Sequence, residues 1–436
     1  MSLVSAGSLV SPGWLLSSCR KASLIDGFQY SGKVIIIGAG AAGLYAGYLL
    51  KSLGVDFTLL EASSVYGGRL GKLTGFADYS IDTGAQWMHG RTSIVADLVR
   101  SKNIGITLDN TELSYWFQGQ VVSSLPKDPF IFEQENLPDI SFLEYAHQQG
   151  FGTEYDHIIE AIAGDQGADA TMLSARWNQK DEEHWVSGDE DFKFNATYFD
   201  VFHEYIAQEI LPNIQVNTPV VSVDYSADKI QIIDSFNNFF EADKVIVTVP
   251  ISILQLGEIA FVPALPSSKT EAFSKFGMGP GMKVFMKFSV KFYDDNLYGG
   301  SVCAAYLDDT VGKSTSDHVL MAFVMGHQAA ALHALGSDAA ITNALLQELD
   351  GIYNGQASAT FLDSIVFDYS AKPYIKGAYG YSTVGMGDAR KVAAEPVGNS
   401  LFFAGEAMNV NGHHQTVHGA VESGYKAVMD MINGLT

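Results

Sequence analysis

Three glycines and one acid have the types and the spacing of residues that bind a dinucleotide. Gly38, Gly40 and Gly43 form the pattern G-x-G-x-x-G, and Glu61 follows about twenty residues later. In this pattern the first glycine permits a tight turn, the second lets backbone approach a pyrophosphate, and the third lets a helix pack closely on a strand. An acid at the end of the following strand accepts a hydrogen bond from a ribose hydroxyl. These residues therefore predict a site for FAD or NAD.

The elements around these glycines have the order that such a site requires. Val34 to Ile37 is a short β-branched run typical of a buried parallel strand, and 55–60 has the same character. Between them, Leu44, Leu49 and Leu50 recur at helical spacing. The N–H groups at the start of this helix would point at the phosphates. A glycine turn that serves packing alone is the alternative, and the strand, helix and strand together favour the dinucleotide.

A second glycine pair lies just beyond the acidic strand end. Gly67-Gly68-Arg69 could add N–H groups and a positive charge to a pyrophosphate site. An arginine in a solvated loop explains the same triplet equally well, so both interpretations stay open.

Composition limits the partners. The chain has 436 residues, enough for two domains, and 47% of them are hydrophobic. Its formal charge of −23 disfavours nucleic acid as a partner and suits a cationic ligand, although a charge that serves solubility is an equal alternative. Cys19 and Cys303 are the two cysteines, so at most one bridge forms and no zinc cluster of cysteines is available.

Two short acidic clusters occupy 181–183 and 189–191. They could form a mouth that attracts amines or supply general bases. Exposed acid clusters are more often solvated faces, and we predict that these are too.

The N-terminal arm, residues 1–31, is nearly uncharged up to Leu16-Ser-Ser-Cys19 and then continues with Arg20 and Lys21. This stretch resembles the apolar segment and lipid-attachment box of a bacterial lipoprotein signal, without the basic region expected upstream. We therefore expect an exported or lipid-anchored protein, with an ordinary N-terminal arm on a cytoplasmic protein as the alternative. No membrane span is expected elsewhere.

Periodicity predicts further elements along the chain. The predicted helices are 91–103, 141–149, 153–162, 198–210, 269–276, 336–354 and 416–432, the last with Thr416 as its N-cap. The predicted strands are 214–216, 219–225, 229–234, 239–249, 281–288, 317–326 and 400–404.

Several motifs, in one order, resemble the FAD-dependent amine oxidase family. They are the segment from Ile37 to Gly43, Glu61-Ala62, Gly67 to Arg69, Asp82 to Gly90, Leu401 to Glu406 and Thr416 to Gly424. The form Gly84-x-x-Trp87-x-His89-Gly90 is most similar to the branch of polyamine oxidases, spermine oxidases and flavin-dependent histone lysine demethylases. The motifs bracket nearly the whole chain.

This resemblance implies an α/β fold, α+β overall. A Rossmann-like FAD-binding domain formed by 32–96, 214–266 and 396–436 would be interleaved with a substrate domain of mixed sheet and helices formed by 97–213 and 267–395.

The resemblance also implies which residues hold FAD. Tyr369 takes the place of a usual tryptophan, and Tyr374 that of a second aromatic. Ala378 stands where monoamine oxidases carry the cysteine bound to flavin, which implies noncovalent FAD. The cofactor-binding residues are Gly38, Gly40, Gly43, Glu61, Gly68, Arg69, Gly84, Ala85, Gln86, Trp87, Val220, Tyr369, Gly405, Glu406 and Val417.

Four further residues are implied at the catalytic centre. Lys283 would reach the flavin N5 through a water, Tyr379 would form one wall of an aromatic cage, and Thr416 would occupy the opposite wall. His89 would lie at the cavity. The implied reaction is like that of a polyamine oxidase: the C–N bond of a small amine, a polyamine, is oxidised to an imine with hydride transfer to flavin. O2 then reoxidises the flavin and is reduced to H2O2. No metal is implied.

Two other functions stay open. An L-amino-acid oxidase would need an arginine for the substrate carboxylate, for which Arg91 and Arg176 are candidates. A redox-inactive, FAD-bound interaction module is the alternative of a different class. Histone demethylation is disfavoured, because no long helical insertion or basic surface is apparent.

Overall fold

A computed structural model of the chain describes residues 28–130 and 136–435. The lipobox-like segment Leu16 to Cys19 and most of the predicted N-terminal arm lie outside the described residues. Within them, no helix combines the length and the apolar character needed to cross a bilayer.

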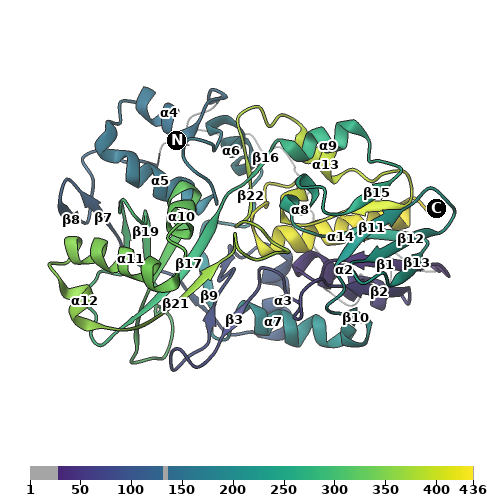
Figure 1. Cartoon of the computed structure of the whole chain (residues 1–436), viewed down its shortest axis with the longest axis horizontal. Coiled ribbons are helices and arrows are strands. Elements are labelled where there is room, and N and C mark those ends of the chain that lie inside the picture. The colour runs from purple at the N-terminus through teal and green to yellow at the C-terminus, as the bar shows by residue number, and fades with distance from the viewer. Residues whose placement is uncertain (1–27, 131–135, 436) are drawn as a thin grey trace, which may run out of the picture.

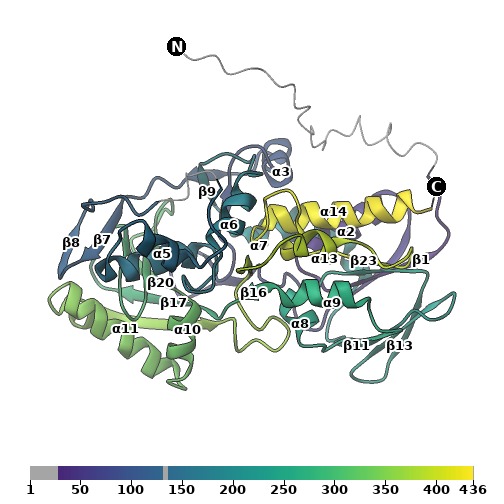
Figure 2. The same cartoon turned by 90° about the horizontal axis from the view of Figure 1, so that it is seen from above.

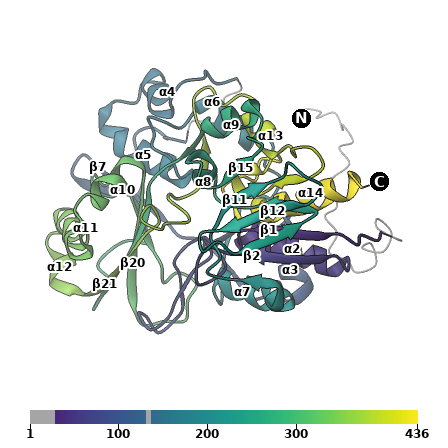
Figure 3. The same ribbon diagram turned by 45° about the vertical axis from the view of Figure 1, so that its right-hand side comes forward.

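A five-stranded parallel sheet forms one half of the molecule, with β1 at its centre. Its order is β10-β2-β1-β14-β23, and Val34 to Ile37 pair on both sides, which explains why this run is apolar throughout. Helices α2 and α14 pack side by side against it, and a second sheet of order β13-β12-β11-β15 lies beside it (Figures 1 and 3). The elements are β1 (Lys33–Ile37), α2 (Ala41–Ser52), β2 (Asp56–Leu60), β10 (Ile214–Gln215), β11 (Val220–Asp224), β12 (Ile230–Asp234), β13 (Phe239–Ala242), β14 (Lys244–Val247), α8 (Ile251–Gln255), β15 (Ala260–Val262), β23 (Leu401–Phe403), η3 (Glu406–Met408) and α14 (Val417–Asn433).

A seven-stranded mixed sheet forms the other half, in the order β21-β17-β20-β19-β18-β7-β8. Side chains alternate along β17: Val284 and Met286 pack toward α10 and α11, whereas Phe285 packs toward α4 and α5. The helices therefore cover both faces of this sheet (Figure 2). The elements are β7 (Leu113–Phe117), β8 (Gln120–Val122), α4 (Phe142–Gln148), η1 (Thr153–Tyr155), α5 (Asp156–Asp165), α6 (Ala175–Glu182), β17 (Gly281–Phe288), β18 (Asn296–Tyr298), β19 (Ala305–Asp308), β20 (His318–Met325), α10 (Gly326–His333), α11 (Asp338–Ile352), α12 (Gln356–Thr360) and β21 (Phe361–Asp368).

Short elements join the two halves. β5 pairs with β9 in a small sheet of order β5-β9-β6, which brings Trp87 and His89 next to residues a hundred positions later. The remaining elements are β3 (Lys72–Leu73), β4 (Ile81–Asp82), β5 (Trp87–His89), α3 (Ile94–Lys102), β6 (Ile106–Leu108), β9 (Asp191–Phe194), α7 (Tyr198–Tyr205), η2 (Ala207–Asn213), α9 (Ser267–Ser274), β16 (Phe276–Met278), β22 (Gly380–Ser382) and α13 (Ala389–Ala394).

The predicted fold class is confirmed, and most predicted elements lie within a few residues of their places. The helix predicted over 198–210 differs: α7 ends at Tyr205 and continues as 3-10 helix η2, which contains Pro212. The domain boundaries stay a prediction, which the packing refines. Phe202 and Phe273, both predicted in the substrate domain, are buried in the cores around the parallel sheet.

Candidate active site

A single cavity of about 1060 Å³ runs from the ends of β1, β2 and β14 to the seven-stranded sheet. This volume is at the upper end of the roughly 300–1000 Å³ found for small-molecule sites, which suits a large ligand such as a dinucleotide. Every predicted site residue except Gly43 lines it. Gly43 instead takes the packing role: a Cβ there would lie 2.0 Å from the carbonyl oxygen of Gly38.

The glycine turn presents bare backbone to one end of this cavity. Gly38 has φ +104°, a conformation that favours glycine. A Cβ on Gly40 would meet no protein atom within 4 Å, so the space beyond this residue is open. The Glu61 carboxylate is buried and accepts the N–H groups of Ala39 and Ser63, each at 2.8 Å. These bonds fix the carboxylate at the strand end, next to the turn, where a ribose hydroxyl would reach it.

Arg69 and Glu406, which both line the cavity, form an ion pair at 2.8 Å. Arg69 also donates to the carbonyl oxygen of Ala378, and Glu406 accepts the N–H groups of Gly380 and Gln415. The structure thus connects two residues that were predicted separately as cofactor ligands. Their direct contacts with a cofactor stay predictions.

Lys283 is buried on β17 and points into the cavity region around Gly84. Its Nζ donates to the carbonyl oxygen of Gly84 at 2.7 Å and to Oε1 of Gln86 at 2.5 Å. Burial lowers the pKa of Lys283 to about 8, although the nearby Asp309 and Asp82 carboxylates oppose that change. The other amide atom of Gln86, Nε2, is buried without a hydrogen-bond partner. A ligand in the cavity would supply the missing acceptor.

The two expected cage walls differ in what their hydroxyl groups do. Tyr379 donates to the carbonyl oxygens of Gly164 and Asp165 at 3.3 and 3.0 Å, so the end of α5 holds its ring in place. Thr416 caps α14: its Oγ1 accepts the N–H of Gly419 and donates to the carbonyl oxygen of His413. The predicted N-cap is confirmed, and both hydrogen bonds of the Thr416 hydroxyl are made to backbone groups at the start of the helix.

His89 lies at the cavity with an acid from the neighbouring strand. Its Nδ1 is 2.7 Å from Oδ1 of Asp191, and its ring packs edge-on against Trp185 and His418. Trp87 lines the cavity beside it and donates from Nε1 to Asp109 at 2.7 Å. Sequence reasoning named both aromatic groups and placed Asp191 in an acidic cluster, but it did not single out Asp109.

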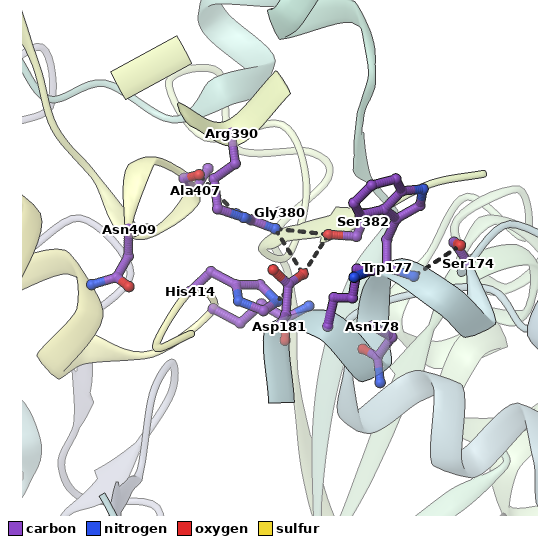
Figure 4. A network of polar contacts seen from close by, with 12 residues as sticks. Ser174, Trp177, Asn178, Asp181, Gly380, Ser382, Arg390, Ala407, Asn409 and His414 are labelled. Carbon is purple, nitrogen blue, oxygen red and sulfur yellow. Dashed lines mark hydrogen bonds and ion pairs between the residues drawn. The ribbon is translucent and has the colours of Figure 1, made fainter. Parts of the chain in front are cut away.

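The interpretation of the acidic clusters as solvated faces holds for Glu182 and Asp189, which are exposed although they line the cavity together with the half-buried Asp191. It is wrong for Asp181. Asp181 accepts from Ser382 at 2.6 Å and lies 3.4 Å from both Arg390 and His414 (Figure 4). Tertiary structure brings these partners from more than two hundred positions away, and nothing in the local sequence announces them.

Two acids and one histidine in this region have pKa values far from their usual range. Burial raises the pKa of Asp165 and of Glu182 to about 7. Burial, together with the Arg390 charge, lowers the pKa of His414 to about 3, so its ring is neutral at the cavity wall. Sequence reasoning missed Asp165 and His414. An adjacent pair of histidines, His413 and His414, was the only local signal for the second.

Comparison with known proteins identifies the family. A family model described as "Flavin containing amine oxidoreductase" matches residues 41–204 and 178–432. The chain belongs to this family. It is 27% identical to human "Lysine-specific histone demethylase 2" over 90% of this chain and 52% of that protein. It is 28% identical to Arabidopsis thaliana "Probable polyamine oxidase 4" over 90% of this chain and 86% of that protein.

Solved structures agree on the fold. Putrescine oxidase in complex with putrescine has a TM-score of 0.78 at 20% identity and covers 92% of this chain and 99% of its own. Cyclohexylamine oxidase from Brevibacterium oxydans IH-35A has the same TM-score and identity, with coverage of 93% and 99%. The chain spans about half the length of the histone demethylases that it matches.

FAD is the cofactor of this flavin-containing amine oxidoreductase, and the residues fit it. Gly40 leaves room for phosphates, Glu61 stands ready for a ribose, and Gln86 has an unpaired buried donor. Ala378 carries no nucleophile, so noncovalent attachment stays our prediction.

Proposed function

We propose that the protein is an FAD-dependent, polyamine-oxidase-like enzyme that oxidises the C–N bond of a small cationic amine and uses O2 as electron acceptor. The observation that carries the proposal is the charge of the cavity wall around His89. Its carboxyl groups come from the residue after β6, from the ends of α5 and α6, from the segment between α6 and β9, and from the start of β9. They are Asp109, Asp165, Glu182, Asp189 and Asp191.

Positive groups offset only part of this wall: the Nζ of Lys193 lies 3.7 Å from Asp109. Arg69 is paired with Glu406, and Lys283 is held by Gly84 and Gln86 in the interior. The wall therefore attracts a ligand with one or more ammonium groups.

Individual residues have separate roles in this proposal. The Tyr379 ring and Trp87 confine the reacting amine, because both are held by hydrogen bonds to the protein. Bound FAD supplies the hydride acceptor for the amine carbon. Lys283, buried and with its pKa lowered to about 8, can hold a water at its Nζ and stabilise negative charge on reduced oxygen. Asp191 orients His89 and binds a distal ammonium group.

The L-amino-acid oxidase alternative is disfavoured by the positions of its candidate arginines. Arg91 pairs with Glu190 at the surface, and Arg176 donates to the carbonyl oxygen of Leu137. Neither is among the residues that line the cavity. Arg69 does line it, but its partner is Glu406.

Anaerobic mixing tests the proposal directly. The FAD-loaded protein is mixed with putrescine, spermidine, spermine, their acetylated forms, aromatic monoamines and L-amino acids, and absorbance is followed at about 450 nm. We expect rapid bleaching by polyamines and none by L-amino acids. Bleaching by amino acids alone would overturn the proposal. A yellow protein that no amine bleaches would favour the interaction module.

A pair of neighbouring variants tests the acidic wall. D191N removes a cavity carboxylate, and E190Q removes the adjacent carboxylate, which pairs with Arg91 outside the cavity. We expect D191N to raise the KM of a polyamine about tenfold, because one half-buried charge contact with the substrate is lost. We expect E190Q to leave this KM unchanged. An equal change of KM in the two variants would contradict the proposal that the cavity wall binds the amine through its carboxylates.

A further inference from the structure

Three metal-ligand side chains from three segments converge behind the cavity wall. Glu160 lies on α5, Asp169 follows that helix, and His327 is in the first turn of α10. One donor atom from each lies within 4.8 Å of the other two. Across residues 28–130 and 136–435, no other group of three or more His, Cys, Asp or Glu residues meets this condition.

The hydrogen bonds of the two carboxylates leave one oxygen of each facing the imidazole. Glu160 accepts the N–H of Ala170 through Oε2, and Asp169 accepts the N–H and the hydroxyl of Thr171 through Oδ1. The other two oxygens, Oε1 of Glu160 and Oδ2 of Asp169, lie 3.4 and 2.7 Å from Nδ1 of His327, and Oδ2 also accepts the backbone N–H of His327 at 3.2 Å. Backbone and Thr171 contacts thus hold both carboxylates in orientation, as ligands of a metal usually are.

Glu160 provides the independent sign of a missing partner. Its side chain is 8% exposed, and Oε1 is buried without any hydrogen bond. An unsatisfied buried carboxylate oxygen costs free energy, so native structures nearly always supply a donor, a water or a cation.

We propose that Glu160, Asp169 and His327 form a binding site for one divalent transition-metal ion of the zinc type. Zinc takes imidazole nitrogen and carboxylate oxygen at about 2.0–2.2 Å in tetrahedral geometry, which places neighbouring donors about 3.3 Å apart. The 3.4 Å spacing of Nδ1 and Oε1 matches this. The 2.7 Å contact opens by a small rotation of His327, whose side chain is 60% exposed. Water completes the coordination from the exposed side.

The position of the site gives the ion a structural role at the cavity. It connects α5, the segment after it and the junction of β20 with α10. These elements carry Asp165 and Met325, which line the cavity, and Gly164, whose carbonyl oxygen accepts from Tyr379. The bound ion would therefore stiffen the wall that positions Tyr379, without touching the substrate.

The chain contains a matched control for this site. His333, on the same helix, has its Nδ1 2.5 Å from Oδ2 of Asp368, and these side chains are 56% and 15% exposed. In the proposed site, His327 and Asp169 are 60% and 14% exposed. The two histidine–carboxylate pairs differ in the third ligand, Glu160, which only the first pair has among the described residues.

Equilibrium dialysis with zinc chloride tests the proposal on FAD-loaded protein treated with EDTA. We expect one zinc ion per chain for the wild type and for H333A, and at least tenfold weaker binding for E160Q and H327A. Zinc should also raise the Tm of wild type and H333A by a few degrees, and not that of E160Q or H327A. Flavin absorbance and circular dichroism establish that each variant is folded before dialysis.

Two results would overturn the site. The first is a wild type that binds no zinc. The second is a loss of zinc affinity in H333A as large as that in H327A, which would indicate adventitious binding by surface histidines. If E160Q does not fold, H327Q carries the test, because the side chain it changes is exposed.

Discussion

The two ends of the cavity are built in different ways. The dinucleotide end consists of backbone, glycines and one acid, contributed mainly by the contiguous stretch from β1 to β2. The amine end consists of side chains such as His89, Asp165 and Tyr379, which come from segments up to about three hundred residues apart. A local turn can thus specify the first end, whereas only the assembled fold creates the second.

Substitutions should act by different mechanisms at the two ends of the cavity. At the dinucleotide end a substitution fails through steric conflict with a bound ligand or with backbone, as at Gly40 and Gly43. At the amine end a substitution changes charge or the orientation of one ring, because each side chain there is held by its own partner. Variants of the first end should therefore have larger effects than variants of the second.

The largest effect is expected from G40A. A Cβ at this position meets no protein atom within 4 Å, so the apoprotein should fold normally, whereas a bound pyrophosphate would lose its closest N–H contacts. The loss of about two charge-assisted hydrogen bonds weakens FAD binding roughly a thousandfold. Fluorescence titration of the apoprotein with FAD measures this affinity.

G351A is the matched control for that variant. Gly351 lies in α11, and a Cβ there also meets no protein atom within 4 Å. Its FAD affinity should equal that of the wild type. Wild-type affinity in G40A as well would show that the pyrophosphate does not approach this glycine.

K283M should have the next largest effect. Removal of the buried cation leaves Gly84 and Gln86 without their donor and removes positive charge next to the site of O2 reduction. We expect the rate at which O2 restores the 450 nm absorbance to fall about a hundredfold, as for loss of one electrostatic contact in an active site. Anaerobic bleaching by the amine should fall much less.

K287M controls for the loss of a lysine from the same strand face. Lys287 is four residues further along β17 and pairs with Asp317. Its variant should react with O2 at the wild-type rate. A K283M enzyme that is slow only in the anaerobic half-reaction would assign the lysine to amine oxidation instead.

The same contrast explains what the sequence could and could not predict. Gly38, Gly40 and Glu61 were predictable because a strand, a turn and a helix in sequence order have one geometry. Lys283 and Tyr379 carry no local signal of function and were found through the resemblance to a family. Asp165 was missed, and Asp191 was named only as part of an acidic cluster, since their place at the cavity depends on how α5 and β9 pack against distant strands.

The pH dependence of amine binding tests this second end. Burial raises the pKa of Asp165 to about 7, so the group is mostly neutral at pH 6 and mostly charged at pH 8. D165N is neutral at both values. The ratio of the diamine KM in D165N to that in the wild type should therefore rise from near one at pH 6 to about fivefold at pH 8.

Taking this ratio cancels the ionisation of the substrate itself and of groups that both proteins share, including Glu182 and Lys283. A ratio that is constant between pH 6 and 8 would show that Asp165 does not change its charge near the amine. A ratio that falls with pH would mean that the charged form repels the substrate or disturbs Tyr298, which donates to it.

The smallest effect concerns Thr416, where the two ends meet. T416V keeps the branched shape but removes the hydroxyl that caps α14, which should cost about 1 kcal/mol of unfolding free energy and change kcat less than twofold. T416S keeps the cap and removes the methyl group. If Thr416 serves as the wall opposite Tyr379, T416S should be the slower enzyme and T416V the less stable one. A normal Tm in T416V, together with a large loss of kcat, would instead assign the hydroxyl itself to the reaction.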